Sequence, residues 1–132
     1  MVTLVVSQAE MGQGISTTLP ALLSDELGAD WSRVRLELAP TAPAYANPRL
    51  KFQFTGNSES TQSFYAHLRQ VGATARTMLA SAAAQRLGVP LAELSVADGR
   101  VTHTASGRSL RFGELAEDAS SAHRRPCGPT TR

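Results

Sequence analysis

The pattern of apolar and polar residues near the start of the chain predicts two β-strands. Residues 2–6 form an almost continuous run of β-branched and apolar side chains, which is typical of a strand buried on both faces. Residues 33–38 alternate strictly, so Val34, Leu36 and Leu38 should share one buried face while the charged side chains face water. The second strand is therefore expected to be half-buried.

A short helix is predicted between these strands. Leucine residues recur at helical spacing over residues 19–27, and Gly28 then supplies a stop in the left-handed conformation. Because Pro20 cannot donate a backbone hydrogen bond inside a helix, we expect the helix to begin near Thr17 or Thr18. The two strands and this helix together predict a β-α-β unit with parallel pairing.

Residues 40–57 lack periodicity and contain three prolines, so a long irregular loop is expected there. Loops of this length in small domains are usually functional or disordered. Tyr45, Phe52 and Phe54 favour an ordered loop, since solvated linkers rarely hold so many aromatic residues.

The longest helix is predicted from Thr61 or Gln62 to Leu87, with Ser58 or Ser60 as its N-cap. Its apolar residues, among them Phe64, Val71 and Met78, follow helical spacing and are expected to lie in the core. Gly72 and the alanines of residues 73–84 form a smooth surface that another element can approach closely. At about 1.5 Å per residue the helix would reach roughly 40 Å, more than a domain of this size needs.

Asp98-Gly99 between two short apolar runs is a signal for a two-residue β-hairpin. His103 on this hairpin is expected to be exposed, and a short helix should follow at residues 113–119. Residues 120–132 lose all periodicity and are expected to be a disordered or non-native tail. The fold class is therefore α+β, with a β-α-β unit, a long proline-containing loop, one long helix, a β-hairpin and a short C-terminal helix.

Composition narrows the classes of partner. The chain has 132 residues and a net charge of +2, and its basic residues are scattered, so neither nucleic acid nor an anionic membrane is indicated. No apolar run is long enough to span a bilayer. A single cysteine excludes an internal disulfide, and three widely separated histidines do not predict a metal site.

Two glycine-containing turns carry the candidate chemistry. In the first, Gly12 and Gly14 flank Gln13, so the glutamine amide and the backbone N–H groups can approach a ligand closely. The second is the polar turn from Gly56 to Ser58, directly before the long helix. A tight turn without ligand is the alternative interpretation of either motif taken alone.

Five motifs, in order, give the chain a family resemblance from about Val5 to Ala119. They are Glu10-Met11-Gly12-Gln13-Gly14, Asp25-Glu26-Leu27-Gly28 followed by Val34-Arg35-Leu36, Tyr45-Ala46-Asn47-Pro48, Thr55-Gly56-Asn57-Ser58, and the run from Leu68 to Leu79. The chain resembles the molybdenum-binding large subunit of the xanthine dehydrogenase and aldehyde oxidase family, most closely the isoquinoline 1-oxidoreductase β-subunit group.

The resemblance implies a site for the molybdenum cofactor, molybdopterin. It places Gln13 at the glutamine whose amide donates to an oxygen ligand on molybdenum, with Gly12 and Gly14 allowing close backbone approach. It also places Gly56 and Ser58 near the pterin. The family usually has a second glycine at the position of Asn57, and asparagine is bulkier although it tolerates positive φ.

The same resemblance implies that the chain is one segment of a larger enzyme, with residues 1–119 belonging to a molybdopterin-binding domain. Such enzymes oxidise N-heteroaromatic compounds or aldehydes with oxygen from water and pass electrons to iron–sulfur clusters. They use a glutamate base in a distant glycine-rich motif, which this sequence lacks; Glu10 and Glu59 are interpreted as structural or solvated carboxylates. The implied partners are the remainder of the subunit and an iron–sulfur small subunit, and the segment alone is expected to be inactive.

Two other functions are compatible with the residues. The alanine-rich helix would suit a self-associating interaction module that binds no cofactor. A phosphate-binding domain built on the Gly12–Gly14 loop is the other alternative, although the chain lacks both a full dinucleotide fingerprint and a Walker lysine.

Overall fold

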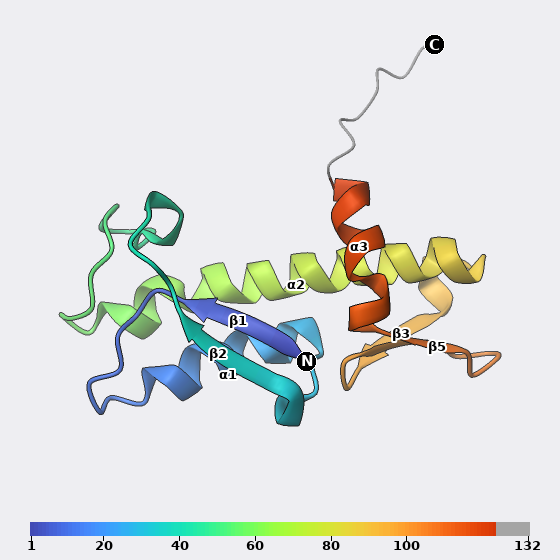
Figure 1. Ribbon diagram of the computed structural model, residues 1–132, viewed down its shortest axis with the longest axis horizontal. Coiled ribbons are helices and arrows are strands. Elements are labelled where there is room, and N and C mark those ends of the chain that lie inside the picture. The colour runs from blue at the N-terminus through green and yellow to red at the C-terminus, as the bar shows by residue number, and fades with distance from the viewer. Residues whose placement is uncertain (124–132) are drawn as a thin grey trace, which may run out of the picture.

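The computed structural model describes residues 1–123 and is an α+β fold, as the sequence predicts. Figure 1 shows one long helix along the molecule, with a small sheet against each half of it. The elements in chain order are β1 (Val2–Val6), α1 (Ile15–Leu27), β2 (Val34–Leu38), α2 (Glu59–Leu87), β3 (Leu94–Ala97), β4 (Arg100–His103), β5 (Ser109–Arg111) and α3 (Phe112–His123), with 3-10 turns η1 (Trp31–Arg33), η2 (Pro43–Tyr45) and η3 (Leu91–Glu93).

The N-terminal half is the predicted parallel β-α-β unit. β1 pairs with β2 in parallel over its whole length, from Val2 opposite Val34 to Val6 opposite Leu38. Leu4 and Val6 are buried against the helices, whereas Val5 is 38% exposed. The prediction that β1 is buried on both faces is wrong, because Thr3 and Val5 are exposed and only the face with Leu4 and Val6 packs into the core. Leu38, at the end of β2, is also exposed rather than buried.

Helix α1 begins at Ile15, earlier than predicted, and contains Pro20 in its interior. Two features stabilise the earlier start. Ile15 is buried in the core, and the first turn is capped by a carboxylate from outside the helix rather than by one of the expected hydroxyl residues. The predicted C-terminal stop is confirmed: Gly28 has a left-handed conformation, and its N–H bonds to the carbonyls of Ser24 and Asp25.

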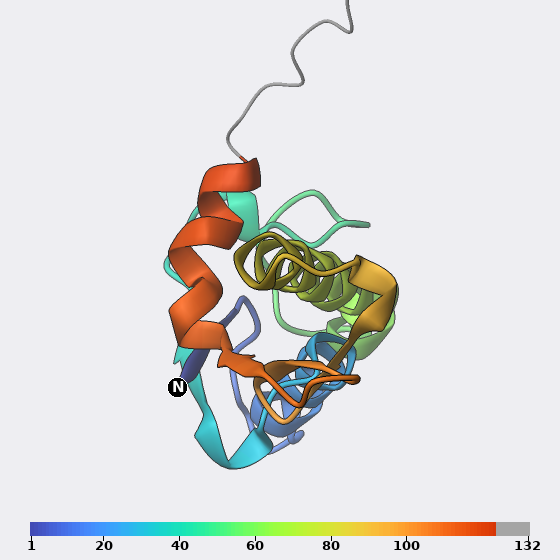
Figure 2. The same cartoon turned by 90° about the vertical axis from the view of Figure 1, so that its right-hand side faces the viewer.

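Helix α2 spans both halves of the molecule (Figure 1), and Figure 2 looks along its axis. Its N-cap is Ser58, one of the two predicted residues, although the helix starts at Glu59, earlier than predicted, and the Ser58 side chain makes no capping bond. Gly72 faces α1 so closely that an added Cβ would lie 2.6 Å from the carbonyl oxygen of Leu23. Phe64 is buried and Met78 packs against the core as expected, but Val71 is 41% exposed.

The alanine-rich part of α2 finds its neighbours within this chain. Ala80, Ala82 and Ala83 are buried, and α3 crosses α2 at this point, with Leu115 fully buried between them. The alanine-rich surface that suggested self-association is therefore largely buried in the chain's own core.

The C-terminal half contains the predicted hairpin. Asp98 and Gly99 both have positive φ, 50° and 69°, as a two-residue turn between β3 and β4 requires. Strand β5 was not predicted; it pairs with β4 after the Ser106-Gly107 turn. Helix α3 runs to His123, so the first residues of the expected tail are helical, and residues 124–132 lie outside the described part of the chain.

His103 is buried, contrary to the expectation that it is exposed. Its ring nitrogens lie 2.7 Å from Glu93 Oε2 and 2.7 Å from Ser106 Oγ. Both partners come from segments that flank the hairpin, so the side chain is held in a polar bridge between them rather than turned to solvent.

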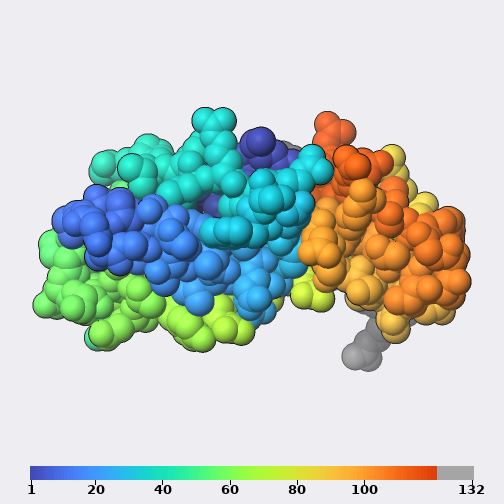
Figure 3. Space-filling view, turned by 90° about the horizontal axis from the view of Figure 1, so that it is seen from below, coloured from blue at the N-terminus to red at the C-terminus, as the bar shows by residue number. Residues whose placement is uncertain are grey.

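The two halves are joined through the hairpin turn as well as through α2. The backbone N–H of Gly99 donates to the carbonyl of Gly28, and the N–H of Phe112 donates to the carbonyl of Gly99. Figure 3 shows the two halves side by side along the molecule. Among the described residues, none of the helices combines the length and hydropathy needed to cross a bilayer.

Candidate functional site

The Gly12–Gly14 loop connects β1 to α1, and the carboxylate of Glu10 organises it. Glu10 Oε1 accepts from the N–H groups of Gly12 (2.8 Å) and Gly14 (3.1 Å). Glu10 Oε2 accepts from the N–H (2.9 Å) and the hydroxyl (2.6 Å) of Ser16. The protein's own anion therefore occupies the N-terminal end of α1. A phosphate-binding role for this loop is disfavoured, because phosphate would need the same donors.

These hydrogen bonds lower the pKa of Glu10 to about 2, with the hydroxyl and backbone N–H of Ser16 as the largest causes. Hydrogen bonds to the charged form of a carboxyl group always favour ionisation. Glu10 is thus a structural carboxylate that remains ionised at all ordinary pH values, which makes it unsuited to act as a general base.

Gln13 is exposed, and its side chain folds back over its own loop. Its Oε1 accepts from the N–H of Met11 (2.5 Å), and its Nε2 donates to the carbonyl of Ala9 (2.8 Å). An amide nitrogen carries two N–H groups, so one remains uncommitted. Within the described residues the backbone N–H of Gln13 also has no hydrogen-bond partner.

The space around this loop is open. Cβ atoms added at Gly12 or Gly14 would meet no atom within 4 Å, and both residues have positive φ (92° and 76°). The positive φ explains why glycine suits these positions in the fold alone. Residues 11–14 are all exposed, so the loop that carries Gln13 is open to solvent.

The second candidate turn lies beside the first, although the two are far apart in sequence. The N–H of Ala9 donates to Thr55 Oγ1 (3.0 Å), and Ser60 Oγ donates to Gln8 Oε1 (2.8 Å). Both loops lie at the end of the molecule toward which β1 points (Figure 1). The structure therefore brings Gly12, Gln13 and Gly14 to the same region as Gly56 and Ser58.

Gln8 links these loops and was not singled out from the sequence. It is 1% exposed, and only Ser7 separates it from Val6, the buried end of β1. A polar residue in that place is a signal that could have been used, because a buried amide needs a partner from a neighbouring element. Here that partner comes from the first turn of α2.

Gly56 has a local structural reason to be glycine. An added Cβ would lie 2.7 Å from the Phe54 ring, so the ring packs directly onto this residue. Asn57 and Ser58 follow with φ of 52° and 55°. The positive φ at Asn57 agrees with the expectation that this position favours glycine but tolerates asparagine.

Glu59, the second acid near the turns, is mostly buried and structural. Its Oε2 forms an ion pair with Arg49 (3.2 Å) and accepts from the hydroxyl of Ser63. Asn47, which is close to Arg49 in sequence, is fully buried. Its Oδ1 accepts from the N–H groups of Arg49 and Leu50. No group of His, Cys, Asp or Glu able to hold a metal ion occurs in residues 1–123.

Comparison with known proteins gives matches over most of the chain. A family model described as a molybdopterin cofactor-binding domain matches residues 1–128. The chain is 41% identical over 117 residues to the beta subunit of isoquinoline 1-oxidoreductase from Brevundimonas diminuta. This match covers 87% of this chain and 15% of that protein. It is 33% identical over 108 residues to a subunit of the nicotinate dehydrogenase of Pseudomonas putida, covering 82% of this chain and 9% of that protein.

The name of a third relative includes a different cofactor, pyrroloquinoline quinone. The membrane-bound aldehyde dehydrogenase [pyrroloquinoline-quinone] of Gluconacetobacter polyoxogenes is 33% identical over 122 residues, covering 92% of this chain and 15% of that protein. Among solved structures, quinoline 2-oxidoreductase from Pseudomonas putida 86 matches with a TM-score of 0.63 at 20% identity, over 96% of this chain and 16% of that chain. This last similarity is one of fold.

Proposed function

The chain belongs to the molybdopterin cofactor-binding domain family, and from this premise we propose that residues 1–119 form one segment of the molybdenum-binding subunit of a molybdenum hydroxylase. The chain spans 15% of the length of the beta subunit of isoquinoline 1-oxidoreductase, so turnover belongs to the longer polypeptide. The observation that carries the proposal is the open Gly12–Gly14 loop, where Gln13 keeps two uncommitted N–H donors.

The residues of the two turns fit a cofactor with oxygen acceptors. Gln13 is a neutral donor, so it can stabilise a charged acceptor without titrating. Gly12 and Gly14 keep side chains away from that acceptor, while Gly56 and Ser58 lie on the adjoining turn. When bound, molybdopterin supplies a molybdenum centre that hydroxylates a carbon next to a ring nitrogen or a carbonyl group, with oxygen from water.

The substrate and partners follow from the same proposal. The names of the relatives point to N-heteroaromatic compounds and aldehydes as the substrate class. Two of these relatives are named as subunits, which supports an assembly with further subunits. We propose the remainder of the molybdenum-binding subunit and an iron–sulfur small subunit as the partners, the latter receiving the electrons.

The test uses the complete subunit that contains this segment. Replacing Gln13 by alanine removes the two side-chain N–H groups, so we expect molybdenum content or turnover to fall about 10–100-fold, the usual effect of losing a group that orients a metal site. Molybdenum is measured by elemental analysis and turnover by substrate oxidation. The matched control is Gln85→Ala, which removes an exposed glutamine of α2 far from the loop and should change neither value.

Two results separate the role of Gln13 from the function itself. Unchanged molybdenum content and turnover in Gln13→Ala would contradict the role of this residue while leaving the function intact. A wild-type subunit that is purified without molybdenum after expression in cells that make the cofactor would contradict the proposed function.

A further inference from the structure

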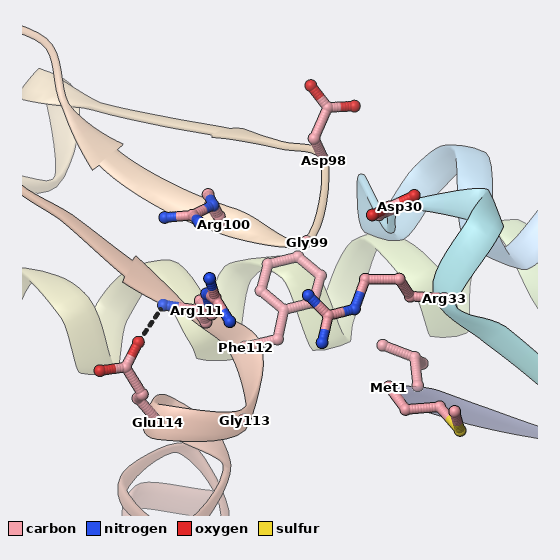
Figure 4. Close-up of a pocket in the computed structure, with 11 residues that line it drawn as sticks. Met1, Asp30, Arg33, Asp98, Gly99, Arg100, Arg111, Phe112, Gly113 and Glu114 are labelled. Atoms are coloured by element: carbon pink, nitrogen blue, oxygen red, sulfur yellow. Dashed lines mark hydrogen bonds between the residues drawn. The ribbon is translucent and has the colours of Figure 1, made fainter.

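Three arginine side chains gather around a pocket of about 390 Å³ where the two halves of the molecule meet. Arg33 comes from η1 in the N-terminal half, Arg100 from β4 and Arg111 from β5. Figure 4 shows the guanidinium groups of Arg33 and Arg111 on either side of the Phe112 ring. The volume lies within the range of sites for small ligands.

The arrangement places like charges together. Arg100 and Arg111 are directly opposite each other on the antiparallel strands β4 and β5, where like-charged pairs are unfavourable. Within the described residues, no ion pair joins any of the three arginines to a carboxylate. The positive charge of Arg33 does contribute to the lowered pKa of Asp30. Among residues 1–123, the Arg100 guanidinium group donates to the Ser109 hydroxyl, at 3.3 Å.

Three carboxylates also border the pocket, but each is committed elsewhere or turned away. Asp30 accepts from the N–H (3.0 Å) and hydroxyl (2.7 Å) of Ser32, and these bonds lower its pKa more than Arg33 does. Glu114 accepts from the backbone N–H of Arg111 at 2.7 Å (Figure 4). The Asp98 side chain points away from the pocket (Figure 4). Within residues 1–123, no carboxylate therefore forms a hydrogen bond or a contact ion pair with any of the three guanidinium groups.

We propose that this pocket binds a small phosphate-bearing ligand through Arg33, Arg100 and Arg111. A planar guanidinium group pairs with two phosphate oxygens at once, and several such groups favour a ligand with more than one negative charge. Helix α3 begins at Phe112, but the Glu114 carboxylate and the Gly99 carbonyl already accept from the Arg111 and Phe112 N–H groups, so the arginine side chains supply the binding.

The pocket is separate from the proposed cofactor contact. It is lined by Val2 at the start of β1, whereas the Gly12–Gly14 loop follows Val6 at the end of the same strand. The inference therefore does not rest on the proposed function.

Isothermal titration of the 132-residue chain with sodium pyrophosphate tests the proposal, with ionic strength held constant by sodium chloride. We expect saturable binding to one site. Arg111→Gln and Arg33→Gln should each weaken it by about tenfold, because each removes one charged hydrogen-bonding group. The control Arg76→Gln changes an arginine of α2 outside the pocket and should leave binding unchanged. Circular dichroism confirms that each variant is folded.

Three results would overturn the proposal. The first is an absence of saturable pyrophosphate binding by the wild-type chain. The second is an equal loss of binding in Arg76→Gln, which would indicate general charge attraction. The third is binding of succinate as tight as that of pyrophosphate, which would assign the pocket to carboxylates instead.

Discussion

Two neighbouring polar residues have distinct tasks in the loop after β1. The Glu10 carboxylate accepts four hydrogen bonds from Gly12, Gly14 and Ser16 and so fixes the backbone. Gln13 uses part of its amide to close the loop and keeps the rest free. Because the backbone is fixed, the free donors of Gln13 are held in a defined place. A preorganised donor lowers the entropic cost of binding an acceptor.

Glu10→Gln should make the chain less stable at neutral pH. The pKa of Glu10 is about 2 in the folded chain against an ordinary value of 4.5, so its contribution is complete above pH 4.5 and is lost as the pH falls toward 2. Urea unfolding should give a lower midpoint for the variant at pH 7 and a smaller difference at about pH 2.5. Glu117→Gln, at an exposed position of α3, is the control. An equal difference at both pH values would contradict this assignment.

At the scale of elements, the contact between α1 and α2 depends on Gly72. An added Cβ would lie 2.6 Å from the Leu23 carbonyl oxygen and 2.9 Å from Glu26 Cβ, so the helices can approach this closely only with glycine. The contact positions both site loops, since one precedes α1 and the other precedes α2.

Gly72→Ala should therefore destabilise the fold by about 1–3 kcal/mol through overpacking. Alanine in place of glycine inside a helix would otherwise stabilise it by roughly 0.5–1 kcal/mol. The same change at Gly113 in α3, where a Cβ meets nothing within 4 Å, provides the matched control and should not destabilise. Urea unfolding measures the stability of both variants. A Gly72→Ala variant more stable than the wild type would contradict the prediction, because it would show that the helices move apart without loss of stability.

At the scale of the whole molecule, α2 joins two halves that each have their own sheet. The resemblance to the isoquinoline 1-oxidoreductase β-subunit group is confirmed by the 41% identity to a member. One continuous cluster of buried residues runs from Leu4 in the first half to Leu115 in the second, so we expect the halves to unfold together.

Leu115→Ala tests this coupling. Leu115 is fully buried, and its truncation should cost about 2–5 kcal/mol. If the halves unfold together, the fluorescence of Trp31, in the other half, should report the same lowered midpoint as far-UV circular dichroism. Leu91→Ala, at a position that is 48% exposed, is the control. A Trp31 transition that stays at the wild-type midpoint would show that the halves unfold independently.

The sequence alone determined the features that depend on short-range chemistry. The Asp98-Gly99 turn, the Gly28 helix end and the long helix follow from glycine conformation and apolar spacing over a few residues. The order of the motifs was also sufficient to identify the family and its cofactor. The exact start of α1 was not predicted, because Glu10 caps this helix from outside it.

Only the tertiary structure decided which residues come together. The contact of Ala9 with Thr55 joins residues 46 positions apart, and no local pattern encodes it. The burial of His103 and the exposure of Val5 depend on which neighbouring elements cover them, and the gathering of Arg33 with Arg111 requires the two halves to meet. Local propensities select the elements, whereas burial and long-range hydrogen bonding decide how the elements and their side chains are placed.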